Sequence, residues 1–259
     1  MKTAVVAQGK GGVGKTATAA HIAWYGVESG LRVLAIDLDT GNLSKSLTAA
    51  ACGIAASQLF SPSEVIGLAA KPADGPRLDL IVADRLLANL IYMPLDQARE
   101  NLSSQMAKLS DAYDLCVIDT APGLSIALGS ALHAADAVIA PVEMEVYSIE
   151  GIKDMLGIIL MAKEINPDLQ FLGILPSRVD LRNPRQVQIL AQVQEAHGNL
   201  LTPFKVGLRS SVADALALGQ PVWKSRKTSA RAAATEMRQM GAYILNKLGL
   251  INENLGDAQ

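Results

Sequence analysis

The sequence has 259 residues, of which 50% are hydrophobic and only 4% aromatic, a composition sufficient to bury the core of an α/β domain. Its formal net charge of −2 excludes a uniformly basic surface, and its two distant cysteines, Cys52 and Cys116, exclude a disulfide framework and a paired-cysteine metal or cluster site. No apolar run reaches the roughly 18 residues that span a membrane, and no signal peptide is evident, so we expect a cytoplasmic protein.

The first elements form one βαβ unit. An apolar strand is predicted for residues 3–7 and a second for residues 32–37. Between them lies a predicted helix over residues 15–29, which Gly30 ends.

The rest of the chain continues this alternation. Further strands are predicted at residues 78–83, 114–119, 137–141 and 171–175. Helical segments are predicted at residues 44–51, 94–109, 124–134, 146–165, 183–197, 210–218 and 229–248. Apolar strands that alternate with helices are typical of a doubly wound, mainly parallel sheet with helices on both faces. We therefore expect an α/β fold and a single domain over residues 1–259, with a polar tail over residues 252–259.

Residues 9–16 read Gly-Lys-Gly-Gly-Val-Gly-Lys-Thr and match the pattern G-x-x-x-x-G-K-[ST] of a phosphate-binding loop. Its glycines let backbone N–H groups converge on phosphate oxygens, and the following helix points its positive end at the same anion. In this pattern Lys15 neutralises the β- and γ-phosphates, and the Thr16 hydroxyl is a ligand of Mg²⁺. A glycine-rich turn can match by chance, but the strand before it and the helix after it favour the phosphate loop. The predicted nucleotide-binding residues here are Gly9, Lys10, Gly11, Gly12, Val13, Gly14, Lys15, Thr16 and Ala17.

Acidic residues end two of the predicted strands. Asp37 and Asp39 alternate at the end of the second strand, so they project to the side on which the phosphate loop lies. One carboxylate could orient an attacking water while the other supports Mg²⁺ or the loop, although acids in this position can also be helix caps. Asp119 ends the strand of residues 114–119 and fits the Walker B role of holding Mg²⁺. The predicted metal-site residues are therefore Thr16, Asp37 and Asp119.

Positive charge is concentrated late in the chain. Residues 176–231 carry nine Lys and Arg against three Asp and Glu, whereas residues 1–175 carry twelve against nineteen. Such a cluster can neutralise the backbone phosphates of a duplex without reading its sequence, although a solvated surface explains any single member. The predicted DNA-binding residues are Arg182, Arg185, Arg209, Lys224, Arg226, Lys227 and Arg231.

The string K-G-G-V-G-K-T at residues 10–16 resembles the variant phosphate loop of the ParA/MinD family of ATPases. D-L-D-T-G-N at residues 37–42, V-I-D-T-A-P at residues 117–122 and S-V-A-D-A-L-A-L-G-Q-P-V-W-K at residues 211–224 extend the resemblance over nearly the whole chain. The sequence is most similar to the short plasmid-partition members of the IncC type. Because the loop begins at residue 9, we expect no N-terminal helix-turn-helix domain of the kind that longer members use to bind operators.

The resemblance implies roles for individual residues. Lys10 is implied to reach the phosphates bound by a partner subunit, so that ATP is enclosed in a homodimer. Asp39 is implied to be the hydrolytic acid, and Lys10, Lys15 and Asp39 are the predicted catalytic residues. Glu145 is implied to contact the ribose across the dimer, and Arg178 to bind the nucleotide near its base.

Two departures from the family accompany these roles. Family members often have Asn at the position of Ser177, which leaves the selectivity for the base open. Many members also have one more residue, usually Gln, before the Gly-Asn pair, whereas here Thr40 leads directly to Gly41. The shorter loop leaves the hydrolysis rate and the response to a partner open.

The resemblance also implies a function, the ATP-dependent segregation of a plasmid or mobile element. ATP and Mg²⁺ would promote the dimer, which would bind non-specific double-stranded DNA on the nucleoid. A ParB/KorB-type centromere-binding partner would stimulate an otherwise weak hydrolysis and so release the dimer.

Two other functions remain as alternatives. A MinD-like membrane-associated positioning ATPase should end in a basic amphipathic helix, but residues 246–259 contain one Lys, two acids and no sustained apolar face, so we expect no membrane partner. An ATP-binding DNA scaffold with negligible turnover stays open because the loop after Asp39 is short.

Overall fold

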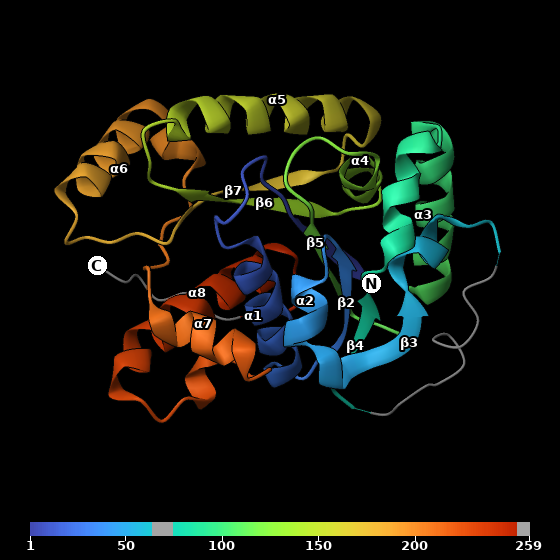
Figure 1. Ribbon diagram of the computed structural model, residues 1–259, viewed down its shortest axis with the longest axis horizontal. Coiled ribbons are helices and arrows are strands. Elements are labelled where there is room, and N and C mark those ends of the chain that lie inside the picture. Colours follow the sequence, from blue (N-terminus) through green and yellow to red (C-terminus); the bar gives the residue numbers. More distant parts are fainter. Residues whose placement is uncertain (64–74, 253–259) are drawn as a thin grey trace.

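The computed structural model describes residues 1–63 and 75–252. Seven strands of this part form one parallel sheet in the order β3-β4-β2-β5-β1-β6-β7, with helices on both faces (Figure 1). The strands are β1 (Lys2–Val6), β2 (Arg32–Leu38), β3 (Ala51–Ala55), β4 (Arg77–Val82), β5 (Leu115–Thr120), β6 (Ala137–Glu143) and β7 (Gln170–Ser177). The predicted doubly wound parallel fold is therefore confirmed.

The helices follow the predicted alternation. The α-helices are α1 (Lys15–Glu28), α2 (Asn42–Ser46), α3 (Leu95–Leu109), α4 (Ile126–His133), α5 (Ser148–Ile165), α6 (Pro184–His197), α7 (Ser210–Ala217) and α8 (Arg231–Lys247). The 3₁₀ helices are η1 (Thr48–Ala50), η2 (Ala56–Phe60), η3 (Arg85–Tyr92), η4 (Gly198–Leu200), η5 (Val222–Lys224) and η6 (Thr228–Ala230). Among the described helices, none combines the length and the apolarity needed to cross a membrane. Apart from Asn252, the predicted polar tail lies outside the described residues.

The prediction of one helical segment over residues 44–51 was wrong at its end. The chain there forms the short α2 and η1, and Ala51 already begins strand β3. Alanine favours helices, but β3 pairs in parallel with β4 at the edge of the sheet and is only partly buried. Pairing with a distant strand therefore overrides the local preference of this alanine-rich segment.

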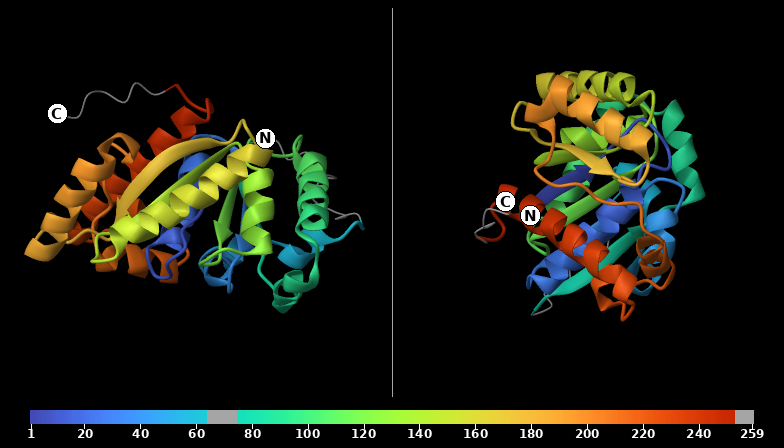
Figure 2. Two further views of the ribbon diagram at one scale, coloured as in Figure 1. Left: turned by 90° about the horizontal axis from the view of Figure 1, so that it is seen from above. Right: turned by 90° about the vertical axis from the view of Figure 1, so that its left-hand side faces the viewer.

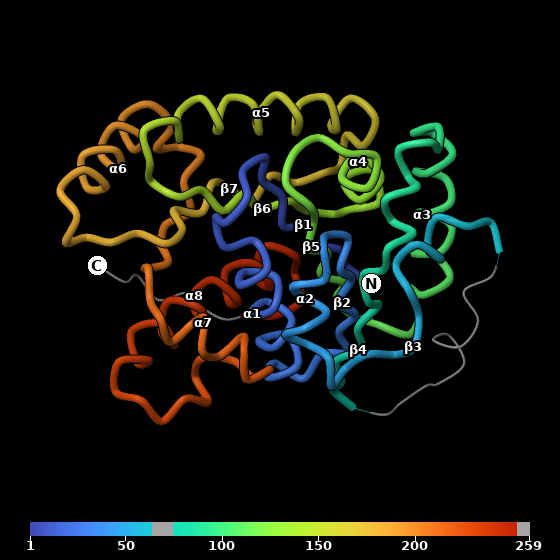
Figure 3. Tube along the Cα trace, in the orientation of Figure 1, coloured from blue at the N-terminus to red at the C-terminus, as the bar shows by residue number. Residues whose placement is uncertain are grey.

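Two apolar layers hold the helices against the sheet. Ala4 and Val6 of β1 pack into the layer that contains α1 and α8, whereas Val5 packs into the opposite layer with α3 and α4. Successive side chains of a strand point to opposite faces, so an entirely apolar strand fills both layers. Figure 2 shows the sheet between α5 and α8. The loops that follow β1, β2 and β5 lie side by side at one edge of the sheet (Figure 3).

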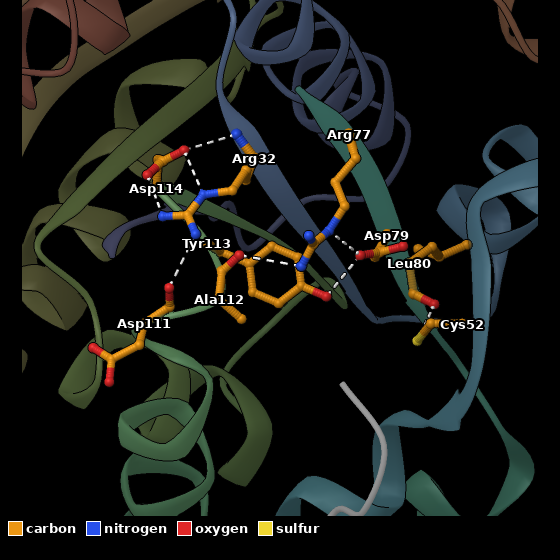
Figure 4. Close-up of polar contacts among 9 residues, drawn as sticks. All are labelled: Arg32, Cys52, Arg77, Asp79, Leu80, Asp111, Ala112, Tyr113 and Asp114. Carbon is orange, nitrogen blue, oxygen red and sulfur yellow. Dashed lines mark hydrogen bonds and ion pairs between the residues drawn. The ribbon is translucent and has the colours of Figure 1, made fainter. Parts of the chain in front are cut away.

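Polar contacts join the amino ends of the neighbouring strands β2, β4 and β5 at the opposite edge (Figure 4). The Arg32 guanidinium donates to both oxygens of Asp114, over 3.1 and 2.7 Å, and the Arg32 amide donates to the same carboxylate over 2.8 Å. Arg77 Nε and the Tyr113 hydroxyl both donate to Asp79 Oδ2, over 2.9 and 2.8 Å. Burial and the bond to Asp79 raise the pKa of Tyr113, so its hydroxyl stays a donor. These contacts fix the strands at one edge and leave the other edge for loops.

The side chain of His21 ties α1 to the segment of η5. Its Nε2 accepts a hydrogen bond from the Val222 amide over 3.2 Å, so Nδ1 carries the proton and donates to the Ala17 carbonyl over 2.7 Å. The ring is 0% exposed and lies edge-on to both Trp24 and Trp223. Burial lowers the pKa of His21 to about 4. The hydrogen bond to Ala17 raises this pKa, but by less than burial lowers it. The imidazole is therefore neutral in the folded protein at pH 7.

We expect His21 to make the fold less stable in acid. Because the folded-state pKa of about 4 lies below the ordinary value of 6.5, the unfolded chain binds the proton more tightly. The stabilisation is complete above pH 6.5 and is lost as the pH falls toward 4, by about 3 kcal/mol in total. Urea unfolding between pH 7.5 and 4 should show this loss in the wild type and a smaller one in His21→Gln. An equal loss of unfolding free energy in the two proteins over this pH range would contradict this role.

Candidate nucleotide-binding site

Residues 9–16 connect β1 to α1, as the sequence predicts. Gly12 and Gly14 have φ angles of 78° and 95°, a left-handed conformation that residues with a Cβ rarely adopt. A Cβ at position 14 would also lie 2.8 Å from the Ser177 Oγ, so a larger residue there would require that side chain to move. Gly14 is the N-cap of α1 and provides no side-chain cap, which leaves the first N–H groups of the helix available to an anion.

Lys15 is buried at the start of α1, with 5% of its surface exposed. Its Nζ donates to the Lys10 carbonyl over 3.1 Å, its one acceptor among the described residues. Burial lowers the pKa of Lys15, while the carboxylates of Asp119 and Asp39 raise it. A buried ammonium with spare donors is suited to bind phosphate oxygens.

Asp119 and Thr16 form the part of the site that fits a divalent cation. The Thr16 hydroxyl donates to Asp119 Oδ2 over 2.7 Å, and Oδ1 of the fully buried Asp119 has no hydrogen-bond partner among the described residues. Burial raises the pKa of Asp119 to about 7, as do Asp37 and Asp39, while the bond from Thr16 lowers it. A bound cation would satisfy the free oxygen and favour the ionised carboxylate.

The described residues contain no cluster of three or more His, Cys, Asp or Glu that could enclose a metal ion. Mg²⁺ commonly takes only one or two protein carboxylates and completes its shell with water and substrate phosphates. The hydroxyl of Thr16 and the carboxylate of Asp119 are therefore a donor set that fits Mg²⁺ held together with a nucleotide.

Asp37 and Asp39 both stand at the end of β2 but differ in their contacts. Asp37 is fully buried, and its oxygens accept from the Asp39 amide over 3.0 Å and from the Ser44 amide and hydroxyl over 2.7 and 2.8 Å. It therefore holds the turn into α2. The Asp39 side chain makes no hydrogen bond within the described part of the chain, and it faces a cavity. Asp39 is free to act on a ligand, whereas a metal role for Asp37 remains a prediction.

The cavity beside the loop has a volume of about 610 Å³ and brings together residues from distant segments. Of the predicted site residues it is lined by Gly12, Gly14, Lys15, Thr16, Ala17, Asp39 and Arg178. Its wall also contains residues that we did not predict: Thr40, Asn42, Lys45, Ser46, Pro122, Leu216 and Ala217. The exposed Lys45 adds a third cation to Lys15 and Arg178, and no pattern in the sequence indicated that it would reach this cavity.

Lys10 and Glu145 contact each other in the single chain. Their side chains form an ion pair and are about half exposed. We predicted that both residues act across a dimer. In the single chain they instead pair with each other. Arg178 lies at the cavity with a φ of 53° and its Nε is 3.4 Å from Glu143 Oε1.

The predicted DNA-binding residues fall into two groups. Three of them form ion pairs within the chain: Arg182 with Asp180 at 2.9 Å, Arg209 with Glu236 at 2.5 Å, and Lys227 with Asp214 at 2.7 Å. Four others are exposed and form no ion pair with the described residues: Arg185, Lys224, Arg226 and Arg231. The second group is therefore the better source of uncompensated positive charge.

Comparison with known proteins identifies relatives over most of the chain. A family model described as an AAA domain matches residues 1–171. Protein IncC of Escherichia coli is 46% identical over 255 residues, which cover 96% of this chain and 70% of IncC. The chromosome-partitioning ATPase Soj of Thermus thermophilus is 32% identical and covers 88% of this chain and 90% of Soj.

Two solved structures of known proteins resemble this chain over nearly its whole length. Cobyrinic acid a,c-diamide synthase from Mycobacterium smegmatis, with bound ADP and magnesium, matches with a TM-score of 0.74 at 27% identity over 96% of each chain. The McdA–ATP complex of Cyanothece matches with a TM-score of 0.77 over 98% of each chain, at an identity of 22% that shows the fold alone. The resemblance predicted from the phosphate loop is confirmed: the chain belongs to the ParA/MinD-type AAA-domain ATPases, as an IncC-like partition member.

Proposed function

We propose that this chain moves a plasmid or mobile element by hydrolysing ATP with Mg²⁺, and that its ATP state binds non-specific duplex DNA on the nucleoid. The observation that carries the proposal is that Lys15, Thr16 and Asp39 share one cavity wall, next to the buried Asp119. A cation for the β- and γ-phosphates, a metal ligand and an acid for the attacking water are the parts that phosphoryl transfer requires. The similarity to IncC and Soj supports the role in partition.

Each residue of the site has a distinct task in this proposal. Lys15 would bind the β- and γ-phosphate oxygens, together with the N–H groups at the start of α1. Thr16 and Asp119 would hold Mg²⁺, which when bound neutralises charge on the phosphates. Asp39 would orient the attacking water in line with the γ-phosphate. Asp37 would keep Asp39 in place through its bonds to the turn before α2.

The ATP dimer requires a rearrangement of Lys10. To reach the phosphates of a partner subunit, Lys10 must leave Glu145, and Glu145 then becomes free to contact the ribose. Exposed ion pairs of this kind contribute only about 0 to 1 kcal/mol, so exchanging this contact for contacts across the dimer is inexpensive. In this scheme a ParB/KorB-type partner stimulates a weak hydrolysis and returns the chain to the state with the internal pair.

The DNA-binding step can be tested by fluorescence anisotropy of a labelled random-sequence duplex with Mg-ATP or Mg-ADP at several salt concentrations. We expect tight, salt-sensitive binding with ATP alone, because a dimer doubles the number of phosphate contacts. Replacing Lys224 and Arg226 together by alanine should lower the slope of log affinity against log salt by about 2 per chain. The exposed Lys108 of α3 offers a control, and Lys108→Ala should keep the wild-type slope.

Equal, weak DNA binding in both nucleotide states would contradict the proposed function. It would favour the MinD-like membrane-associated positioning ATPase. Nucleotide-dependent DNA binding without partner-stimulated phosphate release would instead favour the scaffold that binds ATP with negligible turnover. The two measurements together therefore separate the three candidate functions.

A further inference from the structure

We propose that a second pocket, at the amino end of α7, binds a phosphate oxyanion and that the backbone of duplex DNA supplies it. This inference rests on the proposed function. The pocket has a volume of about 500 Å³. Its charged and hydroxyl side chains are Asp180, Arg182, Lys205, Arg209, Ser210, Ser211, Ser229 and Glu236. We call it the α7 pocket.

The charges of the α7 pocket do not cancel. Arg182 donates to both oxygens of Asp180, over 2.9 and 3.0 Å, and Arg209 donates to both oxygens of Glu236, over 3.2 and 2.5 Å. Each of these pairs joins one cation to one carboxylate. Lys205 is exposed and forms no ion pair with any residue that the structure describes, so one positive charge is left over. An anion of the size of phosphate would compensate this charge.

The amino end of α7 supplies unused hydrogen-bond donors. Its N-cap is Arg209, which provides no side-chain cap. The Ser210 and Ser211 amides donate to no acceptor among residues 1–63 and 75–252. N–H groups at a helix start carry partial positive charge and commonly bind phosphate or other anions.

Ser211 provides independent evidence that the α7 pocket holds a ligand. This residue is 3% exposed, and its Oγ has no hydrogen-bond partner among the described residues. Buried hydroxyls without a partner are rare in folded proteins because their desolvation is not compensated. Since Ser211 lines the α7 pocket, an oxygen of a bound phosphate is a suitable acceptor for its hydroxyl.

The surroundings favour a DNA phosphate over a free nucleotide. The α7 pocket has no aromatic lining residue on which a base could stack. Ser229 of its wall lies in the chain between Arg226 and Arg231, two exposed cations without ion pairs among the described residues. One phosphate in the α7 pocket would therefore place its neighbours along a duplex backbone within reach of further cations.

The same helix also reaches the nucleotide cavity. Leu216 and Ala217, near the carboxyl end of α7, line that cavity, while Ser210 and Ser211 line the α7 pocket. Because the single eight-residue helix α7 lines both sites, a displacement of α7 on ATP binding would change both. The variants below are therefore compared with Mg-ATP and with Mg-ADP.

The test uses a carboxylate placed at the entrance of the α7 pocket. Ser210 is exposed at the first position of α7, where an acidic residue favours the helix, so Ser210→Asp should fold. With Mg-ATP it should bind a random duplex at least about tenfold more weakly than Ser210→Asn, its neutral isostere. Lys205→Ala should lower the salt slope by about 1 per chain, while the control Lys108→Ala leaves it unchanged. Equal DNA affinities for Ser210→Asp and Ser210→Asn would overturn the proposal.

Titration with inorganic phosphate separates this inference from the proposed function. The amide resonances of residues 210 and 211 should shift in the wild type and stay fixed in Ser210→Asp. If these shifts occur but the wild type binds no duplex, the proposed function and DNA as the source of the phosphate are both refuted, while the oxyanion site stands. If the wild type binds duplex but neither phosphate nor Ser210→Asp has an effect, the α7 pocket is refuted and the proposed function stands.

Discussion

Replacing Asp39 by alanine should slow ATP hydrolysis at least about 100-fold while ATP-dependent dimerisation and DNA binding persist. The reason is the difference between the two acids at the end of β2. Asp37 has committed both oxygens to the turn before α2, whereas Asp39 makes no side-chain hydrogen bond among the described residues and lines the nucleotide cavity. Asp39 can therefore be removed without loosening the turn, and the water loses the group that orients it.

Phosphate release with DNA and partner protein, light scattering for the dimer and anisotropy for DNA would together measure this effect. Asp39→Asn is the informative companion variant, because it keeps the shape of the side chain and loses the charge. As a control, Asp96→Ala removes a carboxylate on α3 that is 89% exposed, and it should hydrolyse ATP at the wild-type rate. Wild-type hydrolysis by both Asp39 variants would move the water-positioning role to another residue.

The sequence was sufficient wherever local chemistry determines the structure. Gly12 and Gly14 of the phosphate loop occupy left-handed conformations that other residues avoid, so the glycine pattern identifies the loop without knowledge of the fold. Asp119 lies near the carboxyl end of an apolar strand, and in a parallel sheet the carboxyl ends of the strands share one edge with that loop. For the same reason the order of strands and helices predicted a doubly wound sheet.

Contacts between distant segments were not predictable in this way. Glu236 lies on α8, and no sequence pattern shows that it pairs with Arg209. His21 is an isolated histidine in the sequence, and only the packing of η5 against α1 gives it the Val222 amide as a partner. Lys45 and Leu216 enter the nucleotide cavity because α2 and α7 fold over it. The sequence thus predicts which groups perform the chemistry, whereas tertiary packing decides which charges are free.

Arg209 shows how this difference changes an experiment. As a surface cation it is an obvious residue to replace in a DNA-binding test. The structure gives it two bonds to Glu236, which also accepts from the Gly207 amide over 3.0 Å. An alanine at position 209 would leave the partly buried Glu236 without its cation, so lower stability would accompany any loss of DNA binding. Lys205 and Lys224 are exposed and form no ion pair with the residues that the structure describes, so they give the cleaner measurement.

Lys10→Ala should abolish the ATP dimer while the monomer still binds ATP. Lys15, Thr16 and the N–H groups at the start of α1 belong to the same chain as the nucleotide, so its affinity should change by less than about tenfold. Dimerisation should weaken at least about 100-fold, because each interface loses two charge-assisted contacts to phosphate. Analytical ultracentrifugation with Mg-ATP, in the Asp39→Ala background that prevents turnover, measures the dimer directly.

Glu145→Gln is the matched variant that separates the two possible roles of Lys10. It removes the charge of the ion-pair partner and leaves Lys10 in place. If Lys10 served only to hold Glu145 within the chain, both variants would break the same contact and would dimerise alike. If Lys10 acts across the interface, Lys10→Ala fails to dimerise, whereas Glu145→Gln, with Lys10 already released, still forms the ATP dimer. A normal dimer in Lys10→Ala would refute the contact with the partner subunit and would leave the internal ion pair as the whole role of this lysine.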